Sequence, residues 1–164
     1  MLNEPYPKVE VTTDDKQLAE RISSIAFGKE GELTSVMQYT YQSIFLPERY
    51  AYVSDILDCI SITEMRHYEM LNKLILLLGG DIRVAVRDRG RYVYWNGSYP
   101  DYVQNLKKML YSDIKAEKRA VSEYGAVIER SHDPKVNKLL KRIISDEEHH
   151  ISILTDTYVK LFGK

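Results

Sequence analysis

Residues 140–154 read LKRIISDEEHHISIL, and this stretch decides the fold. Its apolar side chains recur every three or four residues, which predicts an amphipathic helix. Glu147 and His150 fall in the same register as the apolar residues, whereas His149 falls on a polar stripe. The stretch therefore predicts a helix that turns one carboxylate and one imidazole toward the protein interior.

Three further segments show the same helical periodicity. Their apolar residues recur at three- and four-residue spacing, and prolines and glycines mark where each pattern begins or ends. Gly28 and Gly31 interrupt the first of these patterns without ending it. The four predicted helices cover residues 18–46, residues 47–78, residues from about 100 to 130 and residues 134–161, with Asp133 as the cap of the last one.

The connections between these helices define the topology. The first two helices and the last two are each joined by only a few residues, so they must be antiparallel neighbours. Residues 79–99 are long enough to cross the full length of a bundle, and residues 82–86 and 91–95 alternate weakly in the manner of a small hairpin. Residues 1–13 carry two prolines and are predicted to form an extended arm. The sequence therefore predicts an all-α fold, with a single domain of residues 1–164 built as an antiparallel four-helix bundle with one long crossover between the second and third helices.

Ionisable side chains occupy the apolar stripe of every predicted helix. Helical register turns six of them inward: Glu32, Glu64, His67, Glu117, Glu147 and His150. Four carboxylates in an apolar interior would lose solvation and repel one another, and both effects oppose their ionisation. Two divalent cations carry a charge of about +4 that balances four carboxylates, while two neutral imidazoles complete the coordination. The sequence therefore predicts two metal ions per chain, iron or manganese, with these six residues as ligands.

The two halves of the chain repeat the same pattern. Glu32 and Tyr39 recur 85 residues later as Glu117 and Tyr124, and the Glu-x-x-His pair at residues 64–67 recurs 83 residues later. Such a repeat is what a site with approximate twofold symmetry between two helical hairpins requires. Both tyrosines follow their glutamates by two helical turns, so we expect them in the core, where packing with a hydroxyl hydrogen bond is favoured over a role in supporting the metal ligands or in redox chemistry.

Each element of this pattern also has a simpler interpretation. Residues 146–150 could be a charged surface run, and Glu32 could merely favour the start of a helix. Glu117 could pair with Lys115 or Lys118 on the surface. In all four helices the ionisable residues lie on the inward face, at matching positions along the helix, and follow the internal repeat. This agreement favours the metal site over the independent alternatives.

The composition narrows the class of protein. The 23 basic residues are balanced by 24 acidic ones, so no nucleic-acid-binding surface is expected. The longest apolar run, residues 74–78, is too short to span a membrane, and residues 1–10 lack the order of a signal peptide, which predicts a cytoplasmic protein without a membrane partner. Cys59 is the single cysteine, so a cysteine-based iron site within the chain is excluded, and electrons would come from an external donor.

These motifs resemble the ferritin-like superfamily of dimetal-carboxylate proteins, especially bacterioferritin-like and rubrerythrin-like bundles and, more distantly, manganese catalases. The resemblance covers residues 14–162. The segments that carry it are Gly31-Glu32-Leu33 with Gln38-Tyr39, Glu64-Met65-Arg66-His67, Glu117 with Tyr124, and Ile144-Ser145-Asp146-Glu147-Glu148-His149-His150.

The resemblance implies a dimetal oxidoreductase, whose six ligands act through the metals on hydrogen peroxide or dioxygen, with an external electron donor if the reaction is that of a peroxidase. It also implies two alternatives, namely an iron-storage protein with an iron-oxidising site and a protein that disproportionates peroxide as manganese catalases do. A homo-oligomer, dimer or larger, is expected in each case. Ala120 stands where rubrerythrins have a second glutamate one turn after the ligand of the third helix, so the ligand-switching peroxidase mechanism of that group is not expected here.

Overall fold

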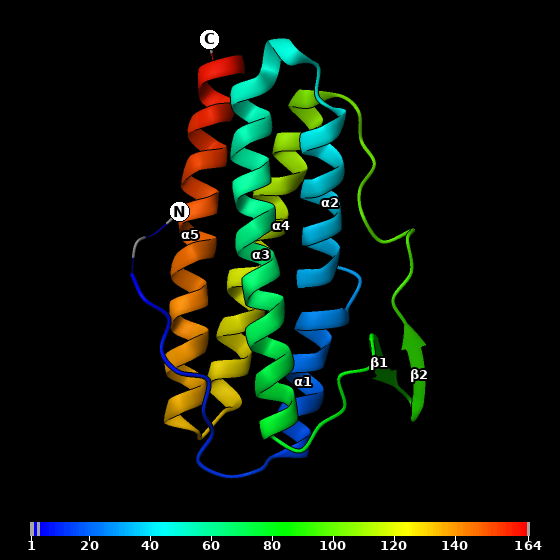
Figure 1. The fold of residues 1–164 in the computed structure, drawn as a ribbon, viewed down its shortest axis with the longest axis vertical. Helices are drawn as coiled ribbons and strands as arrows, with labels where there is room; N and C mark the ends of the chain where they lie inside the picture. Colours follow the sequence, from blue (N-terminus) through cyan, green and yellow to red (C-terminus); the bar gives the residue numbers. More distant parts are fainter. Residues whose placement is uncertain (1, 3, 164) are drawn as a thin grey trace.

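The computed structural model describes residue 2 and residues 4–163, and it confirms the predicted helical bundle with one long crossover (Figure 1). The helices α2 and α3 form one antiparallel hairpin and α4 and α5 form the other. A 3₁₀ turn precedes α3, and a small hairpin lies in the crossover. The elements are α1 (Lys16–Phe27), α2 (Glu32–Phe45), the 3₁₀ turn (Glu48–Tyr50), α3 (Ala51–Leu77), β1 (Ala85–Asp88), β2 (Arg91–Tyr94), α4 (Leu106–Arg130) and α5 (Pro134–Phe162).

The first predicted helix is in fact two helices. Gly28 ends α1 and Gly31 precedes the first residue of α2. A methyl group on Gly31 would overlap the carbonyl oxygen of Ile25, so the tight turn between the two helices requires glycine there. The turn also makes Glu32 the first residue of α2, yet its side chain is buried in the bundle, as the inward register requires.

The third predicted helix begins later than the sequence indicated. Proline at position 100 suggested a start there, but α4 begins at Leu106, after Asn105 caps it by accepting a hydrogen bond from the backbone of Lys108. The segment before the cap stays in the crossover because the backbone N–H of Asp101 donates to Oε1 of Gln38 on α2. The cap of the fourth helix is as predicted, since Asp133 accepts from the first turn of α5.

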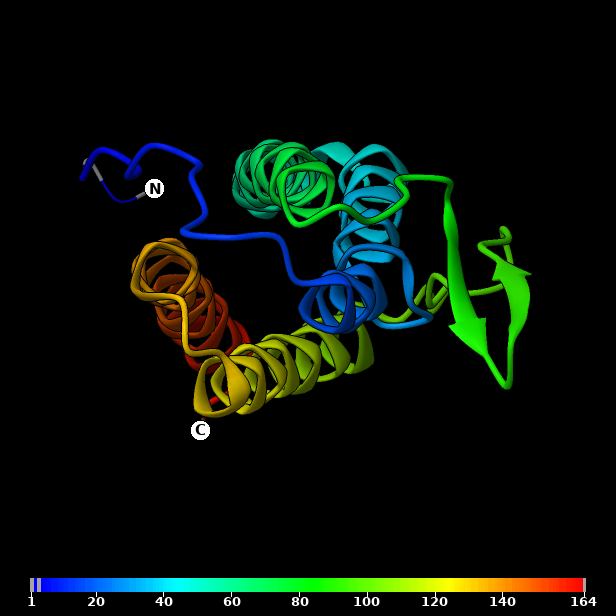
Figure 2. The same ribbon diagram turned by 90° about the horizontal axis from the view of Figure 1, so that it is seen from below.

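The crossover and the N-terminal arm lie on different sides of the bundle. Seen along the helices, β1 and β2 stand outside the bundle beside α1, and the arm runs over α3 and α5 (Figure 2). Arg89 and Gly90 both adopt positive φ between the strands, as a two-residue hairpin turn requires. None of the helices in the described part of the chain is long and apolar enough to cross a membrane.

The core consists of two apolar clusters, one toward each end of the bundle. One cluster contains Leu71 and Leu74 of α3 with Leu140 and Ile143 of α5. The other contains the earlier part of α3, including Leu57, and the later part of α5, including Leu154. The predicted ionisable residues lie on the helices between these clusters, so any group bound there would be enclosed by apolar side chains at both ends.

Replacing Gly31 with alanine is expected to destabilise the protein by about 1–3 kcal/mol, because the new methyl group must push the backbone of Ile25 aside. Gly125 provides a matched control, since a methyl group there meets no atom within 4 Å and α4 would gain helix propensity of about 0.5–1 kcal/mol. Urea unfolding of both variants measures the difference. A Gly31→Ala protein as stable as the wild type would show that the α1–α2 turn is not tightly packed.

Candidate metal centre

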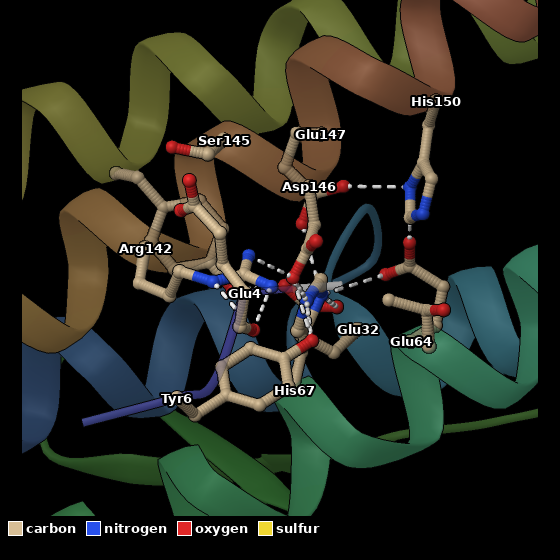
Figure 3. Close-up of polar contacts among 12 residues, drawn as sticks. Glu4, Tyr6, Glu32, Glu64, His67, Arg142, Ser145, Asp146, Glu147 and His150 are labelled. Atoms are coloured by element: carbon tan, nitrogen blue, oxygen red, sulfur yellow. Dashed lines mark hydrogen bonds and ion pairs between the residues drawn. The ribbon is translucent and has the colours of Figure 1, made fainter. Parts of the chain in front are cut away.

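Six ionisable side chains from four helices meet at the middle of the bundle. Figure 3 labels those of α2, α3 and α5, namely Glu32, Glu64, His67, Glu147 and His150. Helix α2 contributes one glutamate, α4 contributes one glutamate, and α3 and α5 each contribute a glutamate and a histidine. Their exposed fractions are 0–3%, so the whole group is inside the protein. The six are the residues selected by register, namely Glu32, Glu64, His67, Glu117, Glu147 and His150. His149 is not among them.

The six residues form two overlapping groups of four. In each group, one oxygen or nitrogen atom from every residue lies within 4.8 Å of the corresponding atoms of the other three. Glu64 and Glu147 belong to both groups, while each remaining glutamate and histidine belongs to one. We call the group with Glu32 and His67 the His67 position, and the group with Glu117 and His150 the His150 position. The arrangement has two centres that share a central pair of carboxylates.

Both histidines face the shared carboxylates with Nδ1. Nδ1 of His67 lies 3.0 Å from Oε1 of Glu147 and 3.7 Å from Oε2 of Glu64. Nδ1 of His150 lies 3.0 Å from Oε1 of Glu64 and 3.1 Å from Oε2 of Glu147. The internal repeat of the sequence therefore becomes an approximate twofold repeat of the site.

Several of these buried atoms lie close together without being aligned for a hydrogen bond. Oε2 of Glu32, Oε1 of Glu64, Oε1 of Glu147 and Nδ1 of His67 have no hydrogen-bond partner among the described residues. A buried polar atom left in this condition costs about 1–3 kcal/mol, so several of them together call for another partner. Carboxylate oxygens and imidazole nitrogens directed into one shared volume are a donor set that fits divalent iron or manganese.

Electrostatic effects divide the four carboxyl groups into two kinds. Burial, with repulsion from Glu64, raises the pKa of Glu32 to about 8 and the pKa of Glu117 well above its usual range. Burial acts to raise the pKa values of Glu64 and Glu147, yet both are lowered, because contacts with Glu32 and the two imidazoles favour ionised Glu64 and the positive charge of His67 favours ionised Glu147. Burial acts to lower the pKa of both histidines, yet the carboxylates around them, Glu147 for His67 and Glu117 for His150, raise it well above the usual value. Without metal, burial and mutual repulsion therefore favour the protonated forms of Glu32 and Glu117, and the carboxylates around them favour the protonated forms of the two histidines.

Two buried tyrosines support the outer glutamates. The Tyr39 hydroxyl donates to Glu117, and the Tyr124 hydroxyl donates to Glu32, so each tyrosine serves the glutamate of the opposite hairpin. Burial and the nearby carboxylate charges raise both tyrosine pKa values well above 10, which keeps the hydroxyls protonated as donors. Tyr39 also lines a cleft of about 350 Å³ between α2 and α4, which therefore comes within one side chain of the site.

Sequence reasoning missed some polar residues around the site. Asp113 is fully buried one helical turn before Glu117, where the side-chain amides of Gln38 and Gln42 donate to it at 2.8 and 3.0 Å. Burial raises the pKa of Asp113 to about 7. Its position four residues before a predicted ligand, on the same helical face, was a signal that could have found it.

A second missed group lies behind His67. Asp146 accepts from Nε2 of that histidine at 3.1 Å and also contacts Tyr6 of the N-terminal arm. Asp146 directly precedes a predicted ligand, which is a usable signal. Tyr6 lies in a segment without periodicity, so nothing in its sequence pattern pointed to the site.

Two comparisons with known proteins match this chain over most of its length. The family model for rubrerythrin matches residues 25–158. Protein CotJC of Bacillus subtilis (strain 168) is 28% identical over 163 residues, covering 88% of this chain and 84% of that protein.

Two solved structures show the same fold. KatB, a manganese catalase from Anabaena, superposes with a TM-score of 0.82 at 23% identity, covering 98% of this chain and 80% of the other. Bacterioferritin of Desulfovibrio desulfuricans, whose structure is described as showing a diiron site in different catalytic states, gives a TM-score of 0.68 at 22% identity, with coverage of 91% and 85%. At these identities the likeness establishes the fold alone.

Proposed function

The chain belongs to the rubrerythrin family, and from that premise we propose that its buried cluster is a dimetal centre that reacts with hydrogen peroxide or dioxygen. The observation that carries the proposal is the pair of overlapping four-residue groups with shared central carboxylates. A single ion would use only four of the six residues and leave one glutamate and one histidine without a partner, whereas two ions use all six.

The six residues would hold iron or manganese in two positions. The His67 position and the His150 position each supply one imidazole and one outer glutamate, and Glu64 and Glu147 serve both. Bound iron or manganese ions supply redox and Lewis-acid chemistry toward peroxide or dioxygen.

The protein contributes enclosure and positioning. The apolar clusters at both ends of the bundle keep bulk water away from the six residues, which are almost completely buried. The hydroxyls of Tyr39 and Tyr124 hold the outer glutamates in place from the opposite hairpin. The cleft at Tyr39 gives small molecules and an electron donor an approach to within one side chain of Glu117.

Two alternative reactions belong to the same site. A manganese catalase and a bacterioferritin share this fold, so the alternatives to be tested are peroxide disproportionation and iron oxidation coupled to storage. Disproportionation releases dioxygen without a reductant, a peroxidase consumes peroxide only when a donor is present, and storage requires a hollow shell of many subunits. These differences separate the three reactions.

The proposal is tested with protein loaded with Mn²⁺ or Fe²⁺ and supplied with hydrogen peroxide. We expect peroxide consumption that requires two ions per chain. Three further measurements identify the reaction: whether dioxygen is released, whether peroxide consumption depends on an added reductant, and what particle size light scattering gives. Protein that binds two ions of either metal and then reacts with neither peroxide nor dioxygen would contradict the enzymatic proposal.

A further inference from the structure

The twofold repeat of the site breaks behind the two histidines. Nε2 of His67 lies 3.1 Å from Oδ2 of Asp146. Nε2 of His150 is buried and has no hydrogen-bond partner within the part of the chain that the structure describes. The two imidazoles therefore present the same nitrogen to the shared carboxylates but differ in what holds the other nitrogen.

The sequence repeat explains this difference. The offset of 83 residues that relates the two Glu-x-x-His pairs makes Thr63 the counterpart of Asp146. The Thr63 hydroxyl donates at 3.1 Å to the carbonyl oxygen of Cys59, one turn earlier in its own helix, and supplies no carboxylate. The same offset makes exposed Cys59 the counterpart of Arg142. The repeat thus holds at the six ligand positions, whereas the acidic and basic pair behind the histidine is present on one side only.

The N-terminal arm adds a further contact on the side that kept the pair. The Tyr6 hydroxyl donates to Oδ2 of Asp146 at 2.6 Å, and Nη1 of Arg142 lies 2.7 Å from the same oxygen (Figure 3). Arg142 also donates at 2.8 Å to the carbonyl oxygen of Glu4, and its guanidinium lies 4.5 Å from the centre of the Tyr6 ring. We call Tyr6, Arg142 and Asp146 the arm cluster. It ties the arm to α5 directly behind His67.

A carboxylate that accepts the second N–H of a metal-bound imidazole fixes the ring orientation and increases the basicity of the ligand nitrogen. Loss of such a partner typically costs about 10- to 100-fold in metal affinity. The arm cluster supplies this partner to His67 alone, and the partner is itself held by a hydrogen bond from Tyr6 and an ion pair with Arg142. The buried Nε2 of His150 receives nothing comparable from the described residues.

We propose that the arm cluster makes the two metal positions inequivalent, so that the His67 position binds its ion first and retains it, while the His150 position fills second and exchanges. The proposal rests on the dimetal centre proposed above and adds an order of loading to it. The residues of the arm cluster act as positioning residues, because they reach the centre only through the imidazole of His67.

Site-resolved metal occupancy tests this order. Crystals of the full chain with one equivalent of Mn²⁺ are measured by anomalous diffraction, which distinguishes the two positions. In the wild type we expect the His67 position to be occupied at least about tenfold more than the His150 position. Asp146→Asn removes the charge and keeps the shape, so the ratio should fall by about 10- to 100-fold. Tyr6→Phe should change it in the same direction by less, because the ring beneath Arg142 remains.

Thr63→Val is the matched control, since it alters the counterpart position without touching the arm cluster, and its occupancy ratio should equal that of the wild type. Equal occupancy in the wild type, preference for the His150 position, or an unchanged ratio in both Asp146→Asn and Tyr6→Phe would overturn the proposal. Crystals with excess Mn²⁺ separate this failure from that of the dimetal centre itself. If the one-equivalent experiment fails in one of these ways but both positions are occupied in excess Mn²⁺, only the order of loading is rejected. If neither position is occupied in excess Mn²⁺, the dimetal centre itself is rejected.

Discussion

Glu147→Ala is expected to lose both metal ions, whereas Glu117→Ala is expected to lose only one. Glu147 belongs to both four-residue groups, so its removal opens both positions, while Glu117 belongs only to the His150 position. Removing the partner of a histidine already costs up to about 100-fold in metal affinity, and removing a direct ligand should cost more. Elemental analysis after gel filtration measures the ions retained per chain.

Glu148→Ala provides the control for this comparison. Glu148 is the exposed neighbour of Glu147 on the same helix, so the substitution should leave two ions bound. Circular dichroism establishes that each variant is helical before its metal content is compared. A Glu147→Ala protein that retains one ion, or a Glu117→Ala protein that retains both, would show that the carboxylates are not shared in the way the geometry indicates.

Metal uptake is expected to release protons at pH 6 to 7. In the metal-free protein the pKa of Glu32 is raised to about 8, and the pKa values of Glu117, His67 and His150 are raised well above their usual ranges. These shifts favour the protonated forms, and divalent ions must displace those protons because metals bind carboxylates and neutral imidazoles.

The sign of the pH dependence follows from these raised pKa values. Lowering the pH protonates groups that must be deprotonated to bind, so the affinity falls as the pH falls below about 8, where Glu32 begins to gain its proton. Displacement of the Glu32 proton alone corresponds to about a tenfold fall in affinity for each pH unit below about 8, and every further proton displaced makes the fall steeper. Titration calorimetry in buffers with different ionisation enthalpies counts the protons. Metal uptake without proton release at pH 6 to 7 would mean that the buried carboxyl groups and histidines are already deprotonated in the metal-free protein.

The sequence was sufficient to predict the position of every residue in the buried cluster. Glu64 and Glu147 could be placed inward because each sits within a long helix whose flanking leucines and isoleucines define the buried face over several turns. The same register separated His150 from His149. Once the short connections make the helices antiparallel neighbours, their periodicity determines which side chains face the bundle interior and at what height along the bundle they lie.

Local backbone features were harder to predict. The break between α1 and α2 depends on the close approach of Gly31 to the carbonyl oxygen of Ile25. The apolar pattern continues on both sides of this turn and therefore predicted one helix. The start of α4 depends on a hydrogen bond from the backbone of Asp101 to Gln38, a residue 63 positions earlier in the chain. Contacts over such distances leave no periodic pattern in the sequence.

The N-terminal arm shows the same difficulty at the site itself. Tyr6 reaches Asp146 across 140 residues of sequence, and its segment has no secondary structure whose register could predict where the side chain points. The symmetric part of the site could thus be predicted from helical register. The asymmetric part, on which the order of loading depends, became visible only from the folded chain.

We propose that six buried residues of one chain hold two metal ions between four helices. Anomalous diffraction from crystals of the wild-type protein saturated with Mn²⁺ tests it most directly. Two peaks are expected within the cluster, one at the His67 position and one at the His150 position, with Glu64 and Glu147 beside both. A single peak, or peaks only at surface carboxylates, would contradict the account.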